Sequence, residues 1–199
     1  MYKRVIKRVI DITICLLGFP LFIIIYLIFA PIIWITDKGP VFYNAERLGK
    51  DGKVFKMYKF RSMKVNAPDL RNSDGSTFNN SNDPRLTRIG KFMRKMSIDE
   101  TPQILNVLRG DMSIIGPRPF MTTHYSGYEN LDAKGKKRLD VRPGITGYSQ
   151  AFFRNSIGQQ EKIDNDVYYA ENISFTLDCK IFLHTIKSVI KSENVYNTN

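Results

Sequence analysis

A long uncharged stretch near the N-terminus limits the folds open to this chain more than any other feature. From Ile12 to Thr36 there is no charged side chain, and these roughly 25 residues are enough for a helix to span the hydrocarbon core of a bilayer. A cleaved secretory signal is a poorer interpretation, because the stretch is too long and no cleavage site of small residues follows it. We therefore predict a membrane helix.

Two features bear on the path of this helix. Pro20 and Pro31 lie inside it, and a proline removes a helix hydrogen bond and kinks the axis. Basic residues flank the stretch on both sides, so a crossing helix would leave one basic flank outside, against the positive-inside tendency. A helix that enters the bilayer, bends at Pro20 and returns avoids this, and a plain spanning anchor is the alternative. The expected division is a basic N-terminus with a re-entrant membrane helix over residues 1–36 and a cytoplasmic domain over residues 37–199.

The charge balance predicts an anionic partner. The 199 residues contain 30 lysines and arginines against 19 aspartates and glutamates, which gives a formal net charge of +11. Such a balance suits nucleic acid, an anionic membrane surface or phosphorylated substrates, and charge alone does not choose among them. The 2 cysteines form no C-x-x-C pair and there are only 2 histidines, so zinc binding and histidine-based acid–base chemistry have little to draw on.

The part after the membrane helix combines short strands with amphipathic helices. Residues 41–43 and 54–60 are rich in strand-forming residues and lie on either side of Asp51-Gly52, which predicts a β-hairpin. Residues 66–84 form a long polar loop of a kind that often closes over a site. Residues 175–191 form an amphipathic helix that packs on the core or lies in the membrane interface. The expected fold is α+β and mostly helical.

Another helix is expected after Thr87, which is a suitable N-cap. Its apolar residues recur at helical spacing and are predicted to face the core, with basic residues elsewhere on its surface. This apolar stripe consists of Ile89, Phe92, Met93 and Met96.

Two adjacent acids, Asp99 and Glu100, stand in an otherwise basic segment and are the first candidates for chemistry. Ser97 and Glu100 fit a capping box, and Thr101 followed by Pro102 offers an alternative helix start. Either way, Asp99 is expected at a helix N-terminus, where free N–H groups and the macrodipole keep a carboxylate ionised, as a nucleophile or metal ligand requires. The plainer interpretation is a helix-start acid without a catalytic role.

Two segments rich in proline and glycine are candidate anion sites. Arg118 lies between two prolines that restrict its backbone, which suits bidentate contact with a phosphate as well as a structural role. Pro143-Gly144 fits the centre of a type II turn, whose glycine lets backbone N–H groups approach an anion closely. Lys59 and Arg61, on the predicted hairpin, are weaker candidates for the same task.

The motifs that follow the membrane helix occur in a distinctive order. They are Gly39-Pro40-Val41-Phe42, Tyr58-Lys59-Phe60-Arg61-Ser62-Met63, Asp83-Pro84-Arg85-Leu86-Thr87, Ser97-Ile98-Asp99-Glu100-Thr101-Pro102-Gln103, Asn106-Val107-Leu108-Arg109-Gly110-Asp111-Met112-Ser113, Gly116-Pro117-Arg118-Pro119 and Arg142-Pro143-Gly144-Ile145-Thr146-Gly147. With this order over nearly its whole length, the chain resembles the bacterial sugar transferases, which are monotopic phosphoglycosyl transferases, in their small PglC-like form.

The resemblance implies an enzyme that moves a sugar 1-phosphate from a UDP-sugar to polyprenol (undecaprenyl) phosphate and releases UMP, which starts the synthesis of lipid-linked glycans. It implies a monotopic protein with interfacial amphipathic helices at the cytoplasmic face of the bacterial inner membrane, in contact with membrane lipid. No nucleic acid is expected as a partner. A membrane-tethered nucleic-acid-binding module remains the alternative, although no recognition motif supports it.

The resemblance also implies roles for individual residues. Asp99 would be the nucleophile that forms an aspartyl-phosphosugar intermediate, and Asp99 and Glu100 would lie at a Mg²⁺ cofactor. Charge on the transferred phosphate would be neutralised by cations, as phosphoryl transfer requires. The implied substrate-binding residues are Lys59, Arg61, Arg94, Arg118, Arg142, Gly144 and Thr146.

Overall fold

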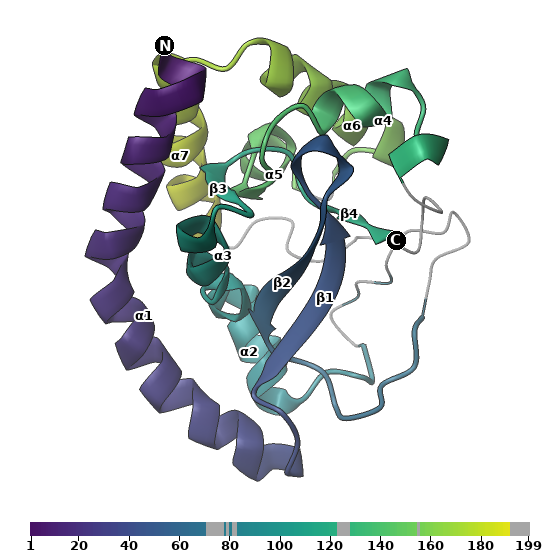
Figure 1. Ribbon diagram of the computed structural model, residues 1–199. Helices are drawn as coiled ribbons and strands as arrows, with labels where there is room; N and C mark the ends of the chain where they lie inside the picture. The colour runs from purple at the N-terminus through teal and green to yellow at the C-terminus, as the bar shows by residue number, and fades with distance from the viewer. Residues whose placement is uncertain (71–77, 79, 81–82, 123–127, 155, 192–199) are drawn as a thin grey trace.

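The computed structural model describes residues 1–70, 78, 80, 83–122, 128–154 and 156–191. A long N-terminal helix curves along one side of a domain built from two short sheets and several shorter helices (Figure 1). This confirms the α+β, mostly helical fold; the predicted polar loop over residues 66–84 lies in part outside the described residues. The elements are, in order, η1 (Tyr2–Ile6), α1 (Lys7–Asp37), β1 (Phe42–Leu48), η2 (Lys50–Gly52), β2 (Val54–Phe60), α2 (Arg88–Lys95), η3 (Ile98–Glu100), α3 (Gln103–Arg109), β3 (Ser113–Ile115), β4 (Phe120–Met121), η5 (Tyr128–Asn130), α4 (Ala133–Arg138), β5 (Gly144–Thr146), α5 (Tyr148–Phe152), α6 (Gln159–Glu171) and α7 (Phe175–Lys191).

Helix α1 runs without interruption over Lys7–Asp37 and bows around the domain (Figure 1). Pro20 and Pro31 both lie inside it, so the helix continues through its two prolines. Phe22 is among the few apolar residues of α1 that are buried against the domain, while most of the others stay exposed. By length and composition, the helical stretch Tyr2–Asp37 is apolar enough to cross a membrane. Its re-entrant path stays a prediction, as does the domain boundary after residue 36.

Polar contacts tie both ends of α1 to the domain. At the N-terminal end, Arg8 donates to two carbonyl oxygens in the last turn of α3, at 2.7 and 3.3 Å. Nearby, the buried carboxylate of Asp11 accepts a hydrogen bond from Ser113 Oγ at 2.7 Å. At the C-terminal end, Asp37 forms an ion pair with Arg61 at 2.5 Å. The two ends of the helix therefore lie against the same domain.

The predicted β-hairpin is confirmed. β1 and β2 pair antiparallel over their whole length, and β1 extends to Leu48, which is further than expected. The connection places Asp51 and Gly52 at positive φ angles of 56° and 75°, a backbone that glycine adopts readily. β4 pairs with the other edge of β1, which gives a three-stranded sheet in the order β2-β1-β4.

The second sheet consists of β3 and β5, which pair in parallel with Ser113 opposite Gly144. The type II turn predicted here is wrong, because Gly144 begins β5 and lacks the positive φ that such a turn requires. The glycine serves a close approach instead. A Cβ at Gly144 would lie 2.1 Å from the backbone nitrogen of Gly116, so only glycine lets these two segments meet.

Helix α2 begins as predicted and packs differently. Thr87 Oγ1 accepts a hydrogen bond from a backbone N–H three residues on, at 2.9 Å, which confirms the N-cap. Met93 is fully buried, but Phe92 and Met96 are 50% and 43% exposed, so the prediction that the whole stripe faces the core is wrong. Phe92 stacks on Phe29 of α1 with ring centroids 6.4 Å apart. A helix of eight residues buries one narrow side here and leaves the rest of its stripe at the surface.

Helix α7 lies beside the first half of α1 (Figure 1) and packs on the core. Ile181 is fully buried, and the buried Asp178 accepts a hydrogen bond from the Tyr2 hydroxyl at 2.6 Å. Phe182 and Ile186 remain 40% and 42% exposed. The prediction that this helix packs on the core is confirmed. Its exposed apolar side chains also suit the other predicted placement, in the membrane interface.

Candidate active site

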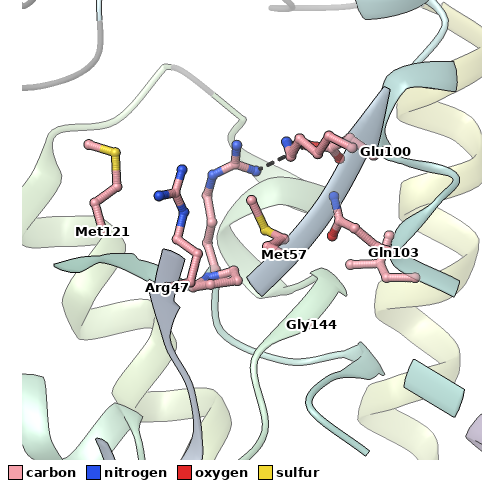
Figure 2. Close-up of a pocket in the computed structure, with 10 residues that line it drawn as sticks. Arg47, Met57, Glu100, Gln103, Met121 and Gly144 are labelled. Carbon is pink, nitrogen blue, oxygen red and sulfur yellow. Dashed lines mark hydrogen bonds and ion pairs between the residues drawn. The ribbon is translucent and has the colours of Figure 1, made fainter. Parts of the chain in front are cut away.

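A small cavity of about 90 Å³ opens between the hairpin, the start of α3 and the segment that carries Arg118. Figure 2 shows Arg47 and Gln103 on either side of Met57 in this cavity, with Glu100 at its edge. The cavity is lined by Arg47, Met57, Lys59, Glu100, Gln103, Arg118, Pro119, Met121, Gly144 and Ile145.

The acid pair lies in a short 3₁₀ turn, η3, between α2 and α3. The predicted capping box is wrong, because Ser97 has a left-handed backbone (φ 56°) and its side chain caps nothing. The alternative start at Thr101 is wrong as well, since its hydroxyl donates to Ile98 O at 2.8 Å and Pro102 takes the N-cap position of α3. The side chain of Glu100, which a capping box needs, is engaged elsewhere.

Glu100 is held by two cations. Lys59 Nζ lies 2.5 Å from its carboxylate and Arg118 Nη1 lies 3.7 Å away. Burial by itself would raise the pKa of Glu100, but the charges of Lys59 and Arg118 outweigh burial and lower this pKa to about 2. Glu100 is therefore ionised at neutral pH and forms the acidic wall of the cavity.

Asp99 has the opposite environment. It is 8% exposed, and burial together with the neighbouring charge of Glu100 raises its pKa, while Lys59 and Arg94 act in the other direction. Among the described residues, no side chain donates a hydrogen bond to its carboxylate. Asp99 does lie in the first turn of a short helix, but a three-residue turn has only a small dipole, and burial is the largest influence on the pKa of this carboxyl.

Arg94 belongs to the surroundings of the acid pair. Its Nε donates to Ser62 Oγ at 3.0 Å, and its charge lowers the pKa of both Asp99 and Glu100. Arg118, whose side chain is 58% exposed, lines the cavity. Together with Lys59 and Gly144, these are the predicted substrate-binding residues that the structure gathers around the acids.

Three of the predicted substrate-binding residues lie elsewhere. Arg61 is buried, and its guanidinium contacts Asp37 at the end of α1. Arg142 donates to the Gly110 carbonyl oxygen at 2.8 Å, and Thr146 Oγ1 lies 2.8 Å from the hydroxyl of Thr185 on α7. None of the three lines the cavity, and each has a structural contact instead.

Two residues of the cavity were missed by the sequence reasoning. Arg47 lies opposite Phe55 in the hairpin, so the register places it on the same face as Met57 and Lys59. Gln103 is three residues after Glu100, which puts both on one side of a helical turn. Gln103 is 2% exposed and lines the cavity. Register and helical spacing were the signals that would have found these two side chains.

The cavity is suited to an anion. Three cations, Arg47, Lys59 and Arg118, line it against the single carboxylate of Glu100. Its volume matches a small charged group, whereas pockets that enclose an entire ligand usually measure about 300 Å³ or more. A larger molecule would therefore place only its anionic group in the cavity and extend over the open side.

Asp99 and Glu100 are also the candidate ligands for a metal ion. Mg²⁺ prefers oxygen ligands and often binds through one or two carboxylates together with substrate phosphates. Two neighbouring carboxylates beside a cavity lined by three cations fit that chemistry. Within the described part of the chain, no three His, Cys, Asp or Glu side chains form a site that could hold a metal alone.

Comparison with known proteins identifies the family of this chain. A family model described as bacterial sugar transferase matches residues 2–192. The chain belongs to the bacterial sugar transferase family. The resemblance inferred from its motifs is confirmed at this level, and the acid pair lies within the matched region.

Relatives of this bacterial sugar transferase include three with informative names. EpsL of Bacillus subtilis (strain 168), an uncharacterized sugar transferase, is 39% identical over 98% of this chain and 92% of its own length. The galactosyl transferase CpsE of Streptococcus agalactiae is 41% identical over 92% of this chain and 42% of its own length. The UDP-N-acetylgalactosamine-undecaprenyl-phosphate N-acetylgalactosaminephosphotransferase of Aeromonas hydrophila is 39% identical, with shares of 93% and 44%. The chain thus spans nearly all of EpsL and less than half of the other two.

Proposed function

We propose that this protein is a phosphoglycosyl transferase that moves a sugar 1-phosphate from a UDP-sugar to undecaprenyl phosphate and releases UMP. The observation that carries the proposal is the cationic cavity with Glu100 at one wall and the buried Asp99 next to Glu100 in the same turn. Two of the named relatives support it, because one is a galactosyl transferase and the other transfers N-acetylgalactosamine phosphate to undecaprenyl phosphate.

The donor would bind with its diphosphate at the cavity. Lys59 and Arg118 already lie on one anion, the Glu100 carboxylate, and Arg47 approaches from the hairpin. Arginine and lysine at such positions neutralise the charge that spreads over phosphate oxygens during transfer. The amide of Gln103 would contact the same group or the sugar attached to it.

In the first step, a carboxylate oxygen of Asp99 would attack the β-phosphorus of the UDP-sugar. The new bond joins that oxygen to phosphorus, the bond from phosphorus to the bridging oxygen breaks, and UMP leaves with the electron pair. The product on the protein is an aspartyl-phosphosugar. Because burial raises the pKa of Asp99, the nearby charges of Lys59 and Arg94 are needed to keep it ionised for this attack.

In the second step, a phosphate oxygen of undecaprenyl phosphate would attack the same phosphorus atom. The bond from phosphorus to the Asp99 oxygen breaks, which regenerates the carboxylate and leaves the sugar on a lipid diphosphate. Bound Mg²⁺ would supply positive charge to the acid pair and to the diphosphate oxygens, with Asp99 and Glu100 as its protein ligands. Glu100, which is ionised at neutral pH, suits the role of a ligand better than that of a proton donor.

The acceptor is a lipid, and the exposed surface of α1 supports a membrane location. Most apolar side chains of α1 face away from the domain, and Trp34 at its C-terminal end lies 4.3 Å from the Lys38 ammonium, a pairing that suits a membrane–water interface. Both ends of α1 contact one domain. This favours a re-entrant, monotopic helix at the cytoplasmic face of the bacterial inner membrane over a spanning anchor.

The alternative of a membrane-tethered nucleic-acid-binding module gains no support from the site. Several of the cations behind the +11 charge are used inside the fold. Such internally bonded cations include Lys7, Arg8, Arg61, Arg85 and Arg138.

The test is UMP release by the purified, detergent-solubilised protein with undecaprenyl phosphate, Mg²⁺ and a panel of UDP-galactose, UDP-glucose and UDP-N-acetylgalactosamine. We expect release with at least one donor, and no release by Asp99→Asn, because an amide does not attack phosphorus. Asp140→Asn is the matched control, since the side chain of Asp140 is half-exposed and forms a surface ion pair with Lys137. Undiminished release by Asp99→Asn would exclude Asp99 as the nucleophile.

A further inference from the structure

The segment that carries Arg118 has unusual backbone anchors. Pro117 and Pro119 lack an N–H group and cannot donate a backbone hydrogen bond, so carbonyl oxygens take part in anchoring this segment. The carbonyl oxygen of Pro117 accepts a hydrogen bond from the N–H of Gly144 at 2.9 Å. The carbonyl oxygen of Arg118 itself accepts one from Arg138 Nη2 at 2.6 Å.

Arg138 is buried beneath this segment together with an acid. It is the last residue of α4, and the same Nη2 forms an ion pair with Asp166 Oδ2 of α6 at 2.5 Å. Its guanidinium lies 3.7 Å from the centroid of the Phe120 ring, in β4. Arg138 and Asp166 are 3% and 2% exposed. One guanidinium thus connects α4, α6, β4 and the backbone of Arg118.

Stability alone is a weak reason for this pair. Taking two charges out of water costs several kcal/mol per ion, and a buried ion pair is often no more stabilising than apolar residues of the same volume. Neither side chain lines the cavity. Their connection to it runs through Arg118, whose guanidinium lies 3.7 Å from Glu100 although its side chain is 58% exposed.

We propose that Arg138 and Asp166 are positioning residues, which hold the Arg118 carbonyl so that the Arg118 guanidinium stays at the cavity wall and meets the anionic group of the substrate. A long exposed side chain has many rotamers, and fixing its backbone reduces the number that must be lost on binding. The role in positioning rests on this structure; the identity of the anion as a UDP-sugar diphosphate rests on the proposed function.

The first test is hydrogen–deuterium exchange of the full-length protein, read by mass spectrometry. In Asp166→Asn, Arg138 loses its charged partner, and we expect peptides that contain Gly116 and Gly144 to exchange at least about tenfold faster. Asp164→Asn is the matched control, because Asp164 forms an exposed ion pair with Lys134 between the same two helices. Unchanged exchange at Gly116 and Gly144 in folded Asp166→Asn would overturn the proposal.

The second test is a double-mutant cycle on UMP release. Asp166→Asn should lower kcat/KM for the UDP-sugar about tenfold in the native background and less than about twofold in an Arg118→Ala background, because its effect acts through Arg118. An equal loss in both backgrounds would indicate a general structural role and overturn the proposal. If the native protein releases no UMP from any donor, the proposed function fails, and the exchange experiment still decides the positioning role.

A second variant covers the case in which Asp166→Asn does not fold. Arg138→Lys keeps a positive charge beside Asp166 but lacks the planar guanidinium that lies on Phe120. It should show the same faster exchange and the same loss confined to the native background. A folded Arg138→Lys protein with native exchange would contradict the proposal in the same way.

Discussion

Two ion clusters meet at Arg118 and use charge differently. In the first, Glu100 is paired with Lys59 and Arg118 at the wall of a cavity. In the second, Asp166 and Arg138 are sealed inside the fold. The cations of the first cluster line the cavity and are partly available to a ligand. The cation of the second cluster is buried and is not available. Arg118 belongs to both, through its side chain in one and its carbonyl oxygen in the other, so binding and support are separated within one residue.

The largest expected effect concerns the stability of the buried Arg138–Asp166 pair, which we call the closed cluster. Arg138→Met leaves Asp166 buried without its partner and should lower the free energy of unfolding by about 3–5 kcal/mol. Arg118→Met removes a half-exposed side chain and should cost about 1 kcal/mol or less. Thermal unfolding of both variants in the same detergent measures the difference. Equal losses would break the distinction between the two clusters.

The next effect concerns the activity that depends on Glu100, Lys59 and Arg118 at the cavity, which we call the open cluster. Lys59→Gln removes the cation 2.5 Å from Glu100, so the pKa values of both Glu100 and Asp99 should rise. Less ionised Asp99 and weaker charge neutralisation should reduce UMP release about 10²–10³-fold, with little change in unfolding temperature. Lys56→Gln, an exposed position on the same strand, is the control. Native activity in Lys59→Gln would remove Lys59 from the site.

The smallest effect is a pH dependence of the closed cluster. Burial raises the pKa of Asp166 to about 6, against the opposing charges of Arg138, Arg118 and Lys162. Because this value lies above that of an unfolded aspartate, Asp166 contributes stability that is fully present below about pH 4 and is lost as pH rises through about 6. Activity should change in the opposite direction. It should fall severalfold below about pH 6, because protonation of Asp166 neutralises its ion pair with Arg138.

Thermal unfolding and kcat/KM measured from about pH 5 to about pH 8 would show both trends. Asp166→Asn should lack this component in each profile, whereas Asp164→Asn, which removes only an exposed ion pair, should keep it. Native and Asp166→Asn profiles that superimpose over this range would mean that Asp166 does not titrate where its burial indicates.

Features set by neighbours in sequence could be predicted. The hairpin around Asp51-Gly52 and the N-cap at Thr87 depend on residues a few positions apart, so the pattern was sufficient. The acid pair Asp99-Glu100 stood out for the same reason, as two acids in a basic segment.

Partner choices across the fold could not be predicted. Glu100 accepts a hydrogen bond from Lys59, 41 residues earlier, and does not form a capping box. Arg61 contacts Asp37, 24 residues earlier, and Thr146 contacts Thr185, 39 residues later. Neither residue therefore lies at the expected substrate site. Each of these side chains has several possible partners, and only the packing of distant elements decides among them.

Arg47 and Gln103 lie between these cases. Once a hairpin register and a helical turn are assumed, both residues fall on the face that carries Lys59 and Glu100. Arg138 and Asp166 carried no such signal, since α4 and α6 are brought beneath Arg118 only by the folded domain.

The attachment of α1 at both ends has a mechanical consequence. A membrane helix joined at one end adapts to bilayer thickness by tilting on its own. Here Arg8 and Asp11 at one end and Asp37 at the other fix the helix to the domain, so any tilt rotates the whole protein. In the membrane location proposed above, the depth of α1 in lipid would therefore set the height of Asp99 above the bilayer, and with it the distance between the cavity and the plane of lipid phosphates.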